Sequence, residues 1–272
     1  MTGDNSPPLP FEPRGEGRKY SIWLRPWVRK RISRNQDLLC LVVGPRGSGK
    51  SYSALELAQS FDRTFTVDRV FFSVADFVDL LVNGNLQRGQ AVILDDAGLF
   101  MNSRTWRDIG NQLMSIVSQS FRYRGLLTFI TVPQADFIDR QSRNMANLLM
   151  EATKEQGTFK IKVPEPNPLK PGEYVFKYPR VGILNQARRT VYEPLKTIHL
   201  DMPPADLAAD YEAKRQTFVR EIQRAFLEKV KKAESGEKPE DKGKSEEPKK
   251  RGRPKRKTNP KSRKNLRKGN MN

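Results

Sequence analysis

The chain has 272 residues, in which 50 Lys and Arg face 31 Asp and Glu, giving a formal net charge of +19. This balance favours a polyanionic partner, either nucleic acid or an anionic membrane face. The single cysteine (Cys40) and single histidine (His199) exclude an internal disulfide framework, a cysteine-based zinc site and a histidine-rich metal cluster. They also argue against a Ser-His-Asp enzyme.

Residues 1–34 are expected to form an N-terminal arm whose first part, 1–17, is rich in Pro and Gly. Its start lacks the basic and apolar regions of a signal peptide, and no run in the chain is long and apolar enough to span a bilayer. We therefore expect a soluble, cytoplasmic protein without a transmembrane segment. Trp23 and Trp27 lie among basic residues, which leaves contact with DNA or a membrane surface open, but packing against the core is favoured.

Residues 35–200 read as one α/β domain, because short apolar runs alternate with helical patterns. Apolar runs such as LLCLVV are typical of strands that are buried on both faces of a parallel sheet. The predicted strands are 38–43, 70–74, 91–96 and 126–132, and the predicted helices are 49–60, 75–82, 104–122 and 137–148.

From residue 153 the pattern changes to alternation of apolar and polar residues. GTFKIKV and EYVFKY flank a turn-rich segment, which predicts an antiparallel β-hairpin on the edge of the sheet. A C-terminal helix is then predicted over about 204–231, within a segment 201–233, and is expected to pack on its own domain. Its apolar stripe consists of Leu207, Tyr211, Phe218, Ile222, Phe226 and Val230.

The last segment, 234–272, holds 15 Lys and Arg against 6 Asp and Glu and has almost no aliphatic residues. Such a segment cannot bury enough apolar surface to offset its ordering entropy, so we expect a disordered basic tail.

The strongest motif is GPRGSGKS, which matches G-x-x-x-x-G-K-[ST] between a predicted strand and a predicted helix. Glycines allow backbone N–H groups to turn toward phosphates at the helix N-terminus. Lys50 would reach the β- and γ-phosphates, and Ser51 would bind Mg²⁺. The predicted nucleotide-binding residues are Gly44, Pro45, Arg46, Gly47, Ser48, Gly49, Lys50 and Ser51.

Two adjacent carboxylates end the strand VILDD. Asp95 suits contact with Mg²⁺ through water, and Asp96 suits the carboxylate that orients or deprotonates the attacking water. The alternative is that one of them caps the following segment. Most ATPases of this type have Glu at the position of Asp96, and Asp is shorter by one methylene.

Gln134 follows the strand 126–132, after Val132 and Pro133. In P-loop ATPases with an extra strand between the P-loop strand and the Asp strand, the tip of that extra strand points at the γ-phosphate. An amide there could sense hydrolysis. The alternative is a polar turn residue after a proline.

Together, GPRGSGKS, VILDD and the segment FRYRGLLTFITVPQADFIDRQSRN resemble the FtsK–HerA superfamily of P-loop ATPases, in particular its Zot-like and viral or plasmid DNA-pumping members. The resemblance covers about residues 38–150. It implies a RecA-like core, ATP and Mg²⁺ as cofactors, assembly into a ring that is often hexameric, and force exerted on DNA or a protein polymer. Asp96 in place of Glu and the smaller domain depart from the large translocases.

The resemblance also implies an arginine that a neighbouring subunit supplies to the γ-phosphate. Arg122 and Arg124 match the position best, with Arg140 and Arg143 as second choices. The alternative is a solvated basic face.

The tail contains PKKRGRPKRK, which resembles an AT-hook. Gly252 lets an extended backbone approach the groove floor, and Arg251 and Arg253 suit the narrow minor groove of A·T-rich DNA. Sequence-independent phosphate binding, or a role in solubility or targeting, are the alternatives. The predicted DNA-binding residues are Arg251, Gly252, Arg253, Pro254, Lys255 and Arg256.

The sequence therefore predicts an ATP-hydrolysing RecA-like P-loop protein that acts on DNA, with packaging, transfer or extrusion of a virus or plasmid genome as its task, in a host cytoplasm or a virion. One alternative is a DNA loader or regulator of the AAA+ type. Another is a DNA-binding protein that uses nucleotide only as a switch.

Overall fold

The computed structural model of the chain describes residues 23–97, 109, 112–113, 125–138, 143–170, 174–184 and 189–234. The chain divides into two units, Met1–Gln223 and Arg224–Asn272, and the sheet with its covering helices belongs to the first. The predicted tail from residue 235 onward lies outside the described residues, as do residues 1–22 of the predicted arm.

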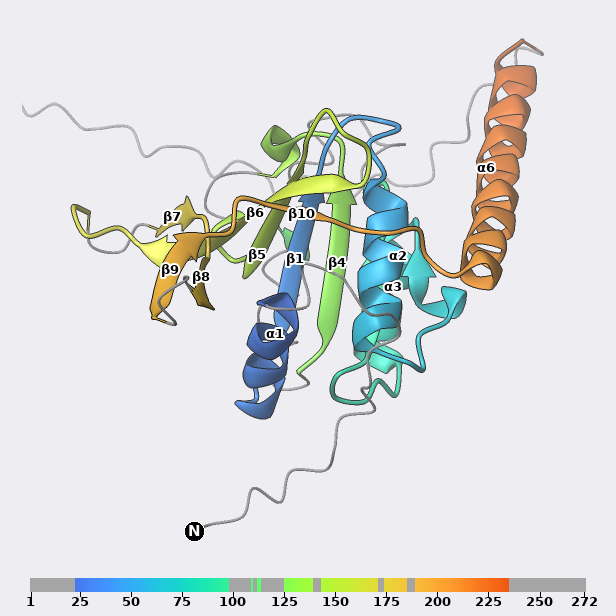
Figure 1. Cartoon of the computed structure of the whole chain (residues 1–272). Coiled ribbons are helices and arrows are strands. Elements are labelled where there is room, and N and C mark those ends of the chain that lie inside the picture. Colours follow the sequence, from blue (N-terminus) through green and yellow to red (C-terminus); the bar gives the residue numbers. More distant parts are fainter. Residues whose placement is uncertain are drawn as a thin grey trace, which may run out of the picture. The chain divides into compact units, whose positions relative to one another are not determined.

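Five parallel strands form the centre of the sheet, in the spatial order β5-β1-β4-β3-β2. The mainly parallel α/β fold is thus confirmed. β4 lies between β1, which leads into the glycine-rich loop, and β3, which leads to Asp95, and this order is that of a RecA-like P-loop NTPase core. Figure 1 shows β4 beside β1. The strands are β1 (Leu38–Val43), β2 (Val70–Phe71), β3 (Ala91–Leu94), β4 (Leu127–Val132) and β5 (Leu148–Ala152).

An antiparallel extension continues the sheet beyond β5. β6 (Thr158–Pro166) pairs with β5, and β7 (Tyr174–Lys177) pairs with β6, which confirms the predicted hairpin. The short strand β10 (Thr197–His199) pairs with the first three residues of β6. β8 (Arg180–Leu184) and β9 (Thr190–Pro194) form a separate two-stranded sheet that the sequence did not predict.

The two faces of β1 belong to two hydrophobic clusters, because successive side chains of a strand point to opposite sides. Leu38, Cys40 and Val42 pack with α1 (Leu24–Ser33) and α2 (Lys50–Phe61), which lie in front of the sheet in Figure 1. Leu39, Leu41 and Val43 pack with α3 (Val74–Asn83) on the other face. Burial on both faces explains why β1 is apolar throughout.

The segment around the two tryptophans belongs to this packed body. α1 buries Leu24, Val28 and Ile32 in the core. Trp23 and Trp27 are partly buried against the same cluster and stack on each other with ring centroids 5.1 Å apart. The favoured interpretation of these tryptophans as packing residues agrees with this arrangement.

The C-terminal helix α6 (Ala205–Glu234) matches the predicted helix but buries only the first part of its apolar stripe. Leu207 and Tyr211 belong to the core, whereas Phe226, near the other end, is 67% exposed. Within the part of the chain that the structure describes, no helix is both long and apolar enough to cross a membrane.

Two predicted elements differ from the structure. Of the helix expected at 137–148, Arg143 is helical and residues 139–142 lie outside the described residues, but both predicted ends are wrong: Phe137 belongs to a 3₁₀ turn (Ala135–Phe137), Ile138 is extended, and Leu148 begins β5. The Leu-Leu-Met-Glu-Ala composition of β5 favours a helix, but pairing with β1 overrides that propensity. The strand expected at 70–74 ends at Phe71 because Ser73 caps α3, accepting a hydrogen bond from the N–H of Asp76. Of the helix expected at 104–122, residues 109, 112 and 113 are helical and the others lie outside the described residues.

Candidate nucleotide-binding site

The glycine-rich loop connects the end of β1 to the first residue of α2 as predicted. Gly47 and Gly49 have φ angles of 78° and 88°, a left-handed conformation that side chains with a Cβ rarely adopt. At Gly44, a Cβ would lie 2.5 Å from the Cβ of Ala152. The loop therefore needs these glycines, and it presents backbone N–H groups at the N-terminus of α2, an arrangement that suits phosphate groups.

Lys50 is the first residue of α2 and is 5% exposed. Its ammonium folds back over the loop and donates a hydrogen bond to the carbonyl oxygen of Pro45, 2.9 Å away. Burial lowers the pKa of Lys50, and the nearby carboxylates of Asp96 and Asp95 act in the opposite direction. The lysine is thus held over the loop between the backbone and two carboxylates.

Asp95 immediately follows β3 and is fully buried. Its Oδ1 accepts a 2.7 Å hydrogen bond from the hydroxyl of Thr131 on β4, and its Oδ2 accepts a 2.5 Å bond from the hydroxyl of Tyr211 on α6. Burial, followed by the charge of Asp96, raises the pKa of Asp95, while hydrogen bonds from Tyr211, Thr131 and Ser51 lower it in part. Ser51 and Asp95, the predicted Mg²⁺ residues, are therefore neighbours.

Asp96 has a φ of 47°, which is unusual for a residue other than glycine. Its backbone N–H donates a 2.8 Å hydrogen bond to the hydroxyl oxygen of Thr131, so one threonine contacts both aspartates. Its carboxylate lies 3.2 Å from the guanidinium of Arg215 on α6. The turn after β3 thereby directs Asp95 into the interior and Asp96 toward α6 and the loop.

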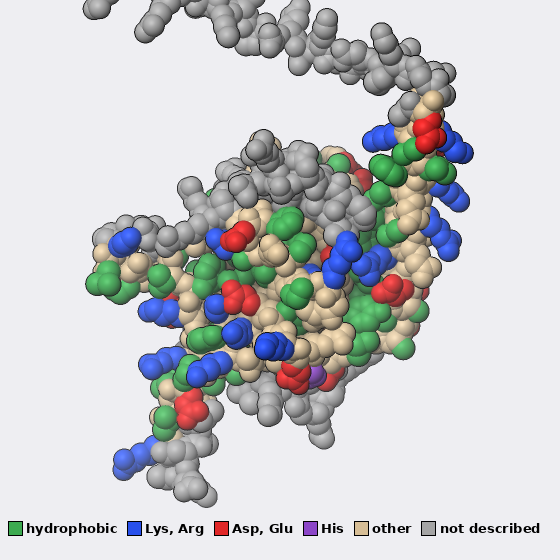
Figure 2. Space-filling model, turned by 90° about the horizontal axis from the view of Figure 1, so that it is seen from above, with side chains coloured by type: hydrophobic (Ala, Val, Ile, Leu, Met, Phe, Trp, Pro, Cys, Tyr) green, Lys and Arg blue, Asp and Glu red, His purple; other side chains and the backbone are tan. Residues whose placement is uncertain are grey.

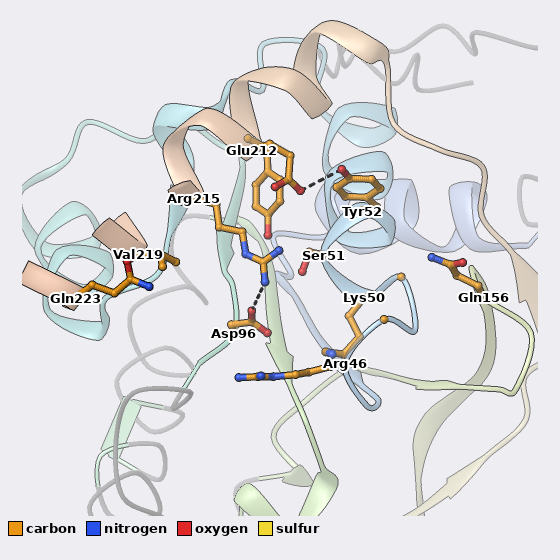
Figure 3. Close-up of a pocket in the computed structure, with 13 residues that line it drawn as sticks. Arg46, Lys50, Ser51, Tyr52, Asp96, Gln156, Glu212, Arg215, Val219 and Gln223 are labelled. Carbon is orange, nitrogen blue, oxygen red and sulfur yellow. Dashed lines mark hydrogen bonds and ion pairs between the residues drawn. The ribbon is translucent and has the colours of Figure 1, made fainter. Parts of the chain in front are cut away.

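A cavity of about 590 Å³ lies between the glycine-rich loop, the end of β3 and α6. Figure 3 shows Lys50 and Arg46 on the loop side and Arg215 reaching from α6 toward Asp96. Its lining comprises Arg46, Gly47, Gly49, Lys50, Ser51, Tyr52, Asp96, Gln156, Tyr211, Glu212, Arg215, Val219 and Gln223.

Of the remaining predicted residues, Ser48, Gln134 and Arg143 are described and do not line the cavity, and the others lie outside the described residues. Ser48 is buried and its hydroxyl donates to the carbonyl oxygen of Pro45 at 2.8 Å, within the loop. Gln134 is exposed just beyond β4 and does not line the cavity. Arg143 lies 3.7 Å from Asp136. The predicted residues Arg122, Arg124, Arg140, Arg251, Gly252, Arg253, Pro254, Lys255 and Arg256 lie outside the described residues, so their roles stay predictions.

The sequence did not identify Tyr211, Glu212 or Arg215 as site residues. In the sequence, Tyr211 belongs to the apolar stripe of the C-terminal helix, and Glu212 and Arg215 are two of its many charged residues. The local sequence does not show whether a charged residue of this helix lies over the site or in solvent, because this depends on where α6 packs.

The residues fit a nucleotide with Mg²⁺. Mg²⁺ takes few protein ligands and prefers oxygen atoms, which Ser51 and Asp95 offer. No group of three or more His, Cys, Asp or Glu side chains that could hold a metal by themselves occurs among the described residues.

No protein family and no curated protein matches the sequence. Among solved structures, the chain is similar to the N-terminal domain of zonular occludens toxin from Neisseria meningitidis, at 15% identity and a TM-score of 0.35, over 63% of this chain and 98% of that one. It is also similar to EssC (ATPases 2 and 3) from Geobacillus thermodenitrificans, at 11% identity and a TM-score of 0.34, over 70% of this chain and 45% of that one. Similarities at this level carry no conclusion about activity, so the fold assignment rests on the strand order and the glycine-rich loop.

Proposed function

We propose that the protein binds and hydrolyses ATP with Mg²⁺ and uses the reaction to move DNA. The observation that carries the enzymatic part is the convergence of Lys50, Ser51 and Asp96 on one cavity, with Asp95 directly behind it. These residues come from the start of α2, directly after the glycine-rich loop, and from the turn after β3, which the sheet order brings to one edge.

Each residue has a role in phosphoryl transfer. The N–H groups of the loop and the ammonium of Lys50 hold the phosphates, and Asp96 orients the attacking water or accepts its proton. Mg²⁺, held through Ser51 and Asp95, would neutralise charge on the β- and γ-phosphates. When a nucleotide binds, the Lys50 ammonium would leave the carbonyl oxygen of Pro45 and donate its hydrogen bonds to the phosphates.

The part of the proposal that concerns DNA rests on charge. The net charge of +19, much of it in residues 234–272, favours a polyanionic partner. Figure 2 views the carboxyl-end edge of the parallel strands and shows Lys and Arg side chains across this face and along α6, with Asp and Glu among them. Assembly into a ring, and a role in packaging or transfer of a virus or plasmid genome, extend the same proposal from the resemblance to FtsK–HerA proteins.

A second candidate is a DNA-binding protein that uses nucleotide as a switch without turnover. It is favoured by the ion pair of Asp96 with Arg215, which engages the carboxylate that catalysis requires. The side chain of Asp96 is also shorter than that of Glu, the usual residue at this position, and this too favours a switch without turnover.

Steady-state ATP hydrolysis by the wild type and by Lys50→Ala, with and without duplex DNA at two salt concentrations, tests the proposal. We expect turnover by the wild type, stimulation by DNA that weakens as salt rises, and loss of turnover in Lys50→Ala. Lys154→Ala removes an exposed lysine and serves as the control with unchanged rates.

Nucleotide binding with turnover no higher than that of Lys50→Ala would favour the switch. Turnover that does not respond to DNA at either salt concentration would remove DNA movement from the proposal and leave the ATPase.

A further inference from the structure

The first half of α6 is anchored to the body next to the candidate site by several contacts. The hydroxyl of Tyr211 donates to Asp95 at 2.5 Å, and the hydroxyl of Tyr52 on α2 donates to Glu212 at 3.0 Å. The ammonium of Lys214 donates to the carbonyl oxygen of Val67 at 2.7 Å. These contacts join α6 to the residue after β3, to α2 and to the segment before β2, and so hold its orientation relative to the site.

An aromatic contact extends this anchoring by another turn. Phe218 stacks on Phe72 with ring centroids 5.1 Å apart, and Phe72 also contacts Tyr211. Residues 211 and 218 are two turns apart, so they share a face of the helix. The segment from 211 to 218 is therefore held at both ends.

Arg215 lies in the middle of this anchored segment, one turn after Tyr211. Its guanidinium lies 3.2 Å from the carboxylate of Asp96 and lines the same cavity as Lys50 and Arg46 (Figure 3). Its side chain is 41% exposed, against 15% for Asp96. Arginine has five N–H donors, and the ion pair uses only one nitrogen, which leaves donors free to face the cavity.

The place of Arg215 indicates which phosphate it would meet. Asp96 is the carboxylate suited to the attacking water, which lies beside the terminal phosphate of a bound triphosphate. A guanidinium in contact with Asp96 is thus on the terminal-phosphate side of the cavity. Phosphate suits the planar fork of arginine, because two parallel N–H groups can bind two of its oxygen atoms.

We propose that Arg215 binds the terminal phosphate of the nucleoside triphosphate from within the same chain, exchanging the carboxylate of Asp96 for phosphate oxygens. The exchange releases Asp96 to act on water only when a triphosphate is present. This inference rests on the proposed nucleotide site. It differs from the expectation drawn from the FtsK–HerA resemblance, in which Arg122 or Arg124 of a neighbouring subunit supplies the positive charge.

The test compares the affinities of the purified full chain for MgADP and for the Mg²⁺ complex of the non-hydrolysable triphosphate AMP-PNP, by titration calorimetry. We expect Arg215→Ala to weaken AMP-PNP binding by about tenfold or more, the size of a lost charge-assisted contact, and to leave ADP binding unchanged. Arg215→Lys keeps the charge without the fork and should fall between the wild type and Arg215→Ala. Because the readout is binding, it does not depend on turnover.

Arg220→Ala is the matched control, since it removes an exposed arginine further along the same helix that does not line the site cavity. It should leave both affinities unchanged, and thermal unfolding of each variant verifies that the fold is intact. Equal weakening of ADP and AMP-PNP in Arg215→Ala, or no change in either, would overturn the inference. Tighter AMP-PNP binding would also overturn it, because Arg215 would then obstruct the site. A wild type that binds neither nucleotide would overturn the proposed function itself.

Discussion

Asp95 shows how a buried carboxyl group is accommodated in this protein. The carboxylate is fully buried, and its hydrogen-bonding neighbours are three hydroxyl groups, those of Thr131, Tyr211 and Ser51. No described cation forms an ion pair with it at salt-bridge distance. The hydroxyl groups therefore replace water as its hydrogen-bond donors. A buried charge without such partners would cost several kcal/mol.

Thr131→Val tests this arrangement, because valine keeps the shape and removes the hydroxyl. Loss of the donor to Asp95 and of the acceptor for the N–H of Asp96 should lower the free energy of unfolding by roughly 1–3 kcal/mol. Chemical denaturation monitored by circular dichroism measures the change.

Thr128→Val on the same strand is the control for Thr131→Val. Thr128 is also fully buried, but its hydroxyl has no hydrogen-bond partner among the described residues. Its replacement should be neutral or stabilising. If both variants lose the same stability, the contacts of Thr131 do not account for its effect.

At the scale of elements, one buried ion pair joins the end of α2 to the start of β3. The carboxylate of Asp62 accepts hydrogen bonds from Arg69 at 2.6 Å and from the backbone N–H of Ala91 at 2.9 Å. Asp62 is 3% exposed and Arg69 is 8% exposed. The pair lies between the segment that leads into β2 and the first residue of β3, so it helps to hold these two strands in register.

Asp62→Ala should be strongly destabilising, since it leaves the guanidinium of Arg69 buried without its carboxylate. The expected loss in the free energy of unfolding is about 3–5 kcal/mol. Asp68→Ala, which removes an exposed carboxylate six residues later, should change stability by less than about 0.5 kcal/mol. Urea denaturation of both variants measures these changes, and a small loss for Asp62→Ala would show that the pair contributes little to the fold.

At the scale of the whole molecule, the residues that form the core and many of those that carry the net charge lie in different parts of the chain. The two hydrophobic clusters are formed by residues up to Tyr211, whereas 15 of the 50 Lys and Arg residues lie in the segment 234–272. Charge at that density governs encounter with polyanions and its dependence on salt, and it contributes little to a fold.

Deleting residues 234–272 should weaken binding to duplex DNA and flatten its salt dependence, because fewer counterions are released per complex. The measurement is the slope of the logarithm of the association constant against the logarithm of salt concentration. As a control, the full chain with Arg251→Lys and Arg253→Lys keeps the charge and should retain the slope while losing any preference for A·T-rich DNA. An unchanged slope after deletion would exclude the tail as a DNA-binding segment.

Much of the fold could be predicted because it depends on local patterns. The apolar runs that became β1, β3 and β4, and the GPRGSGKS loop between β1 and α2, need only strand burial and the backbone freedom of glycine. β5 was missed because its own residues favour a helix and its strand conformation comes from pairing with β1.

The same division applies to the site. The loop, Lys50, Ser51 and the two aspartates could be predicted from local sequence, because a G-x-x-x-x-G-K-[ST] motif between a strand and a helix, and carboxylates at the end of a buried strand, are both patterns of neighbouring residues. The contacts of α6 could not be predicted in this way: the helix begins more than a hundred residues after β3, and its packing places Tyr211 against Asp95 and Arg215 against Asp96. Contacts across such a separation depend on where a helix packs, and its own sequence specifies which face is apolar but not what that face will meet.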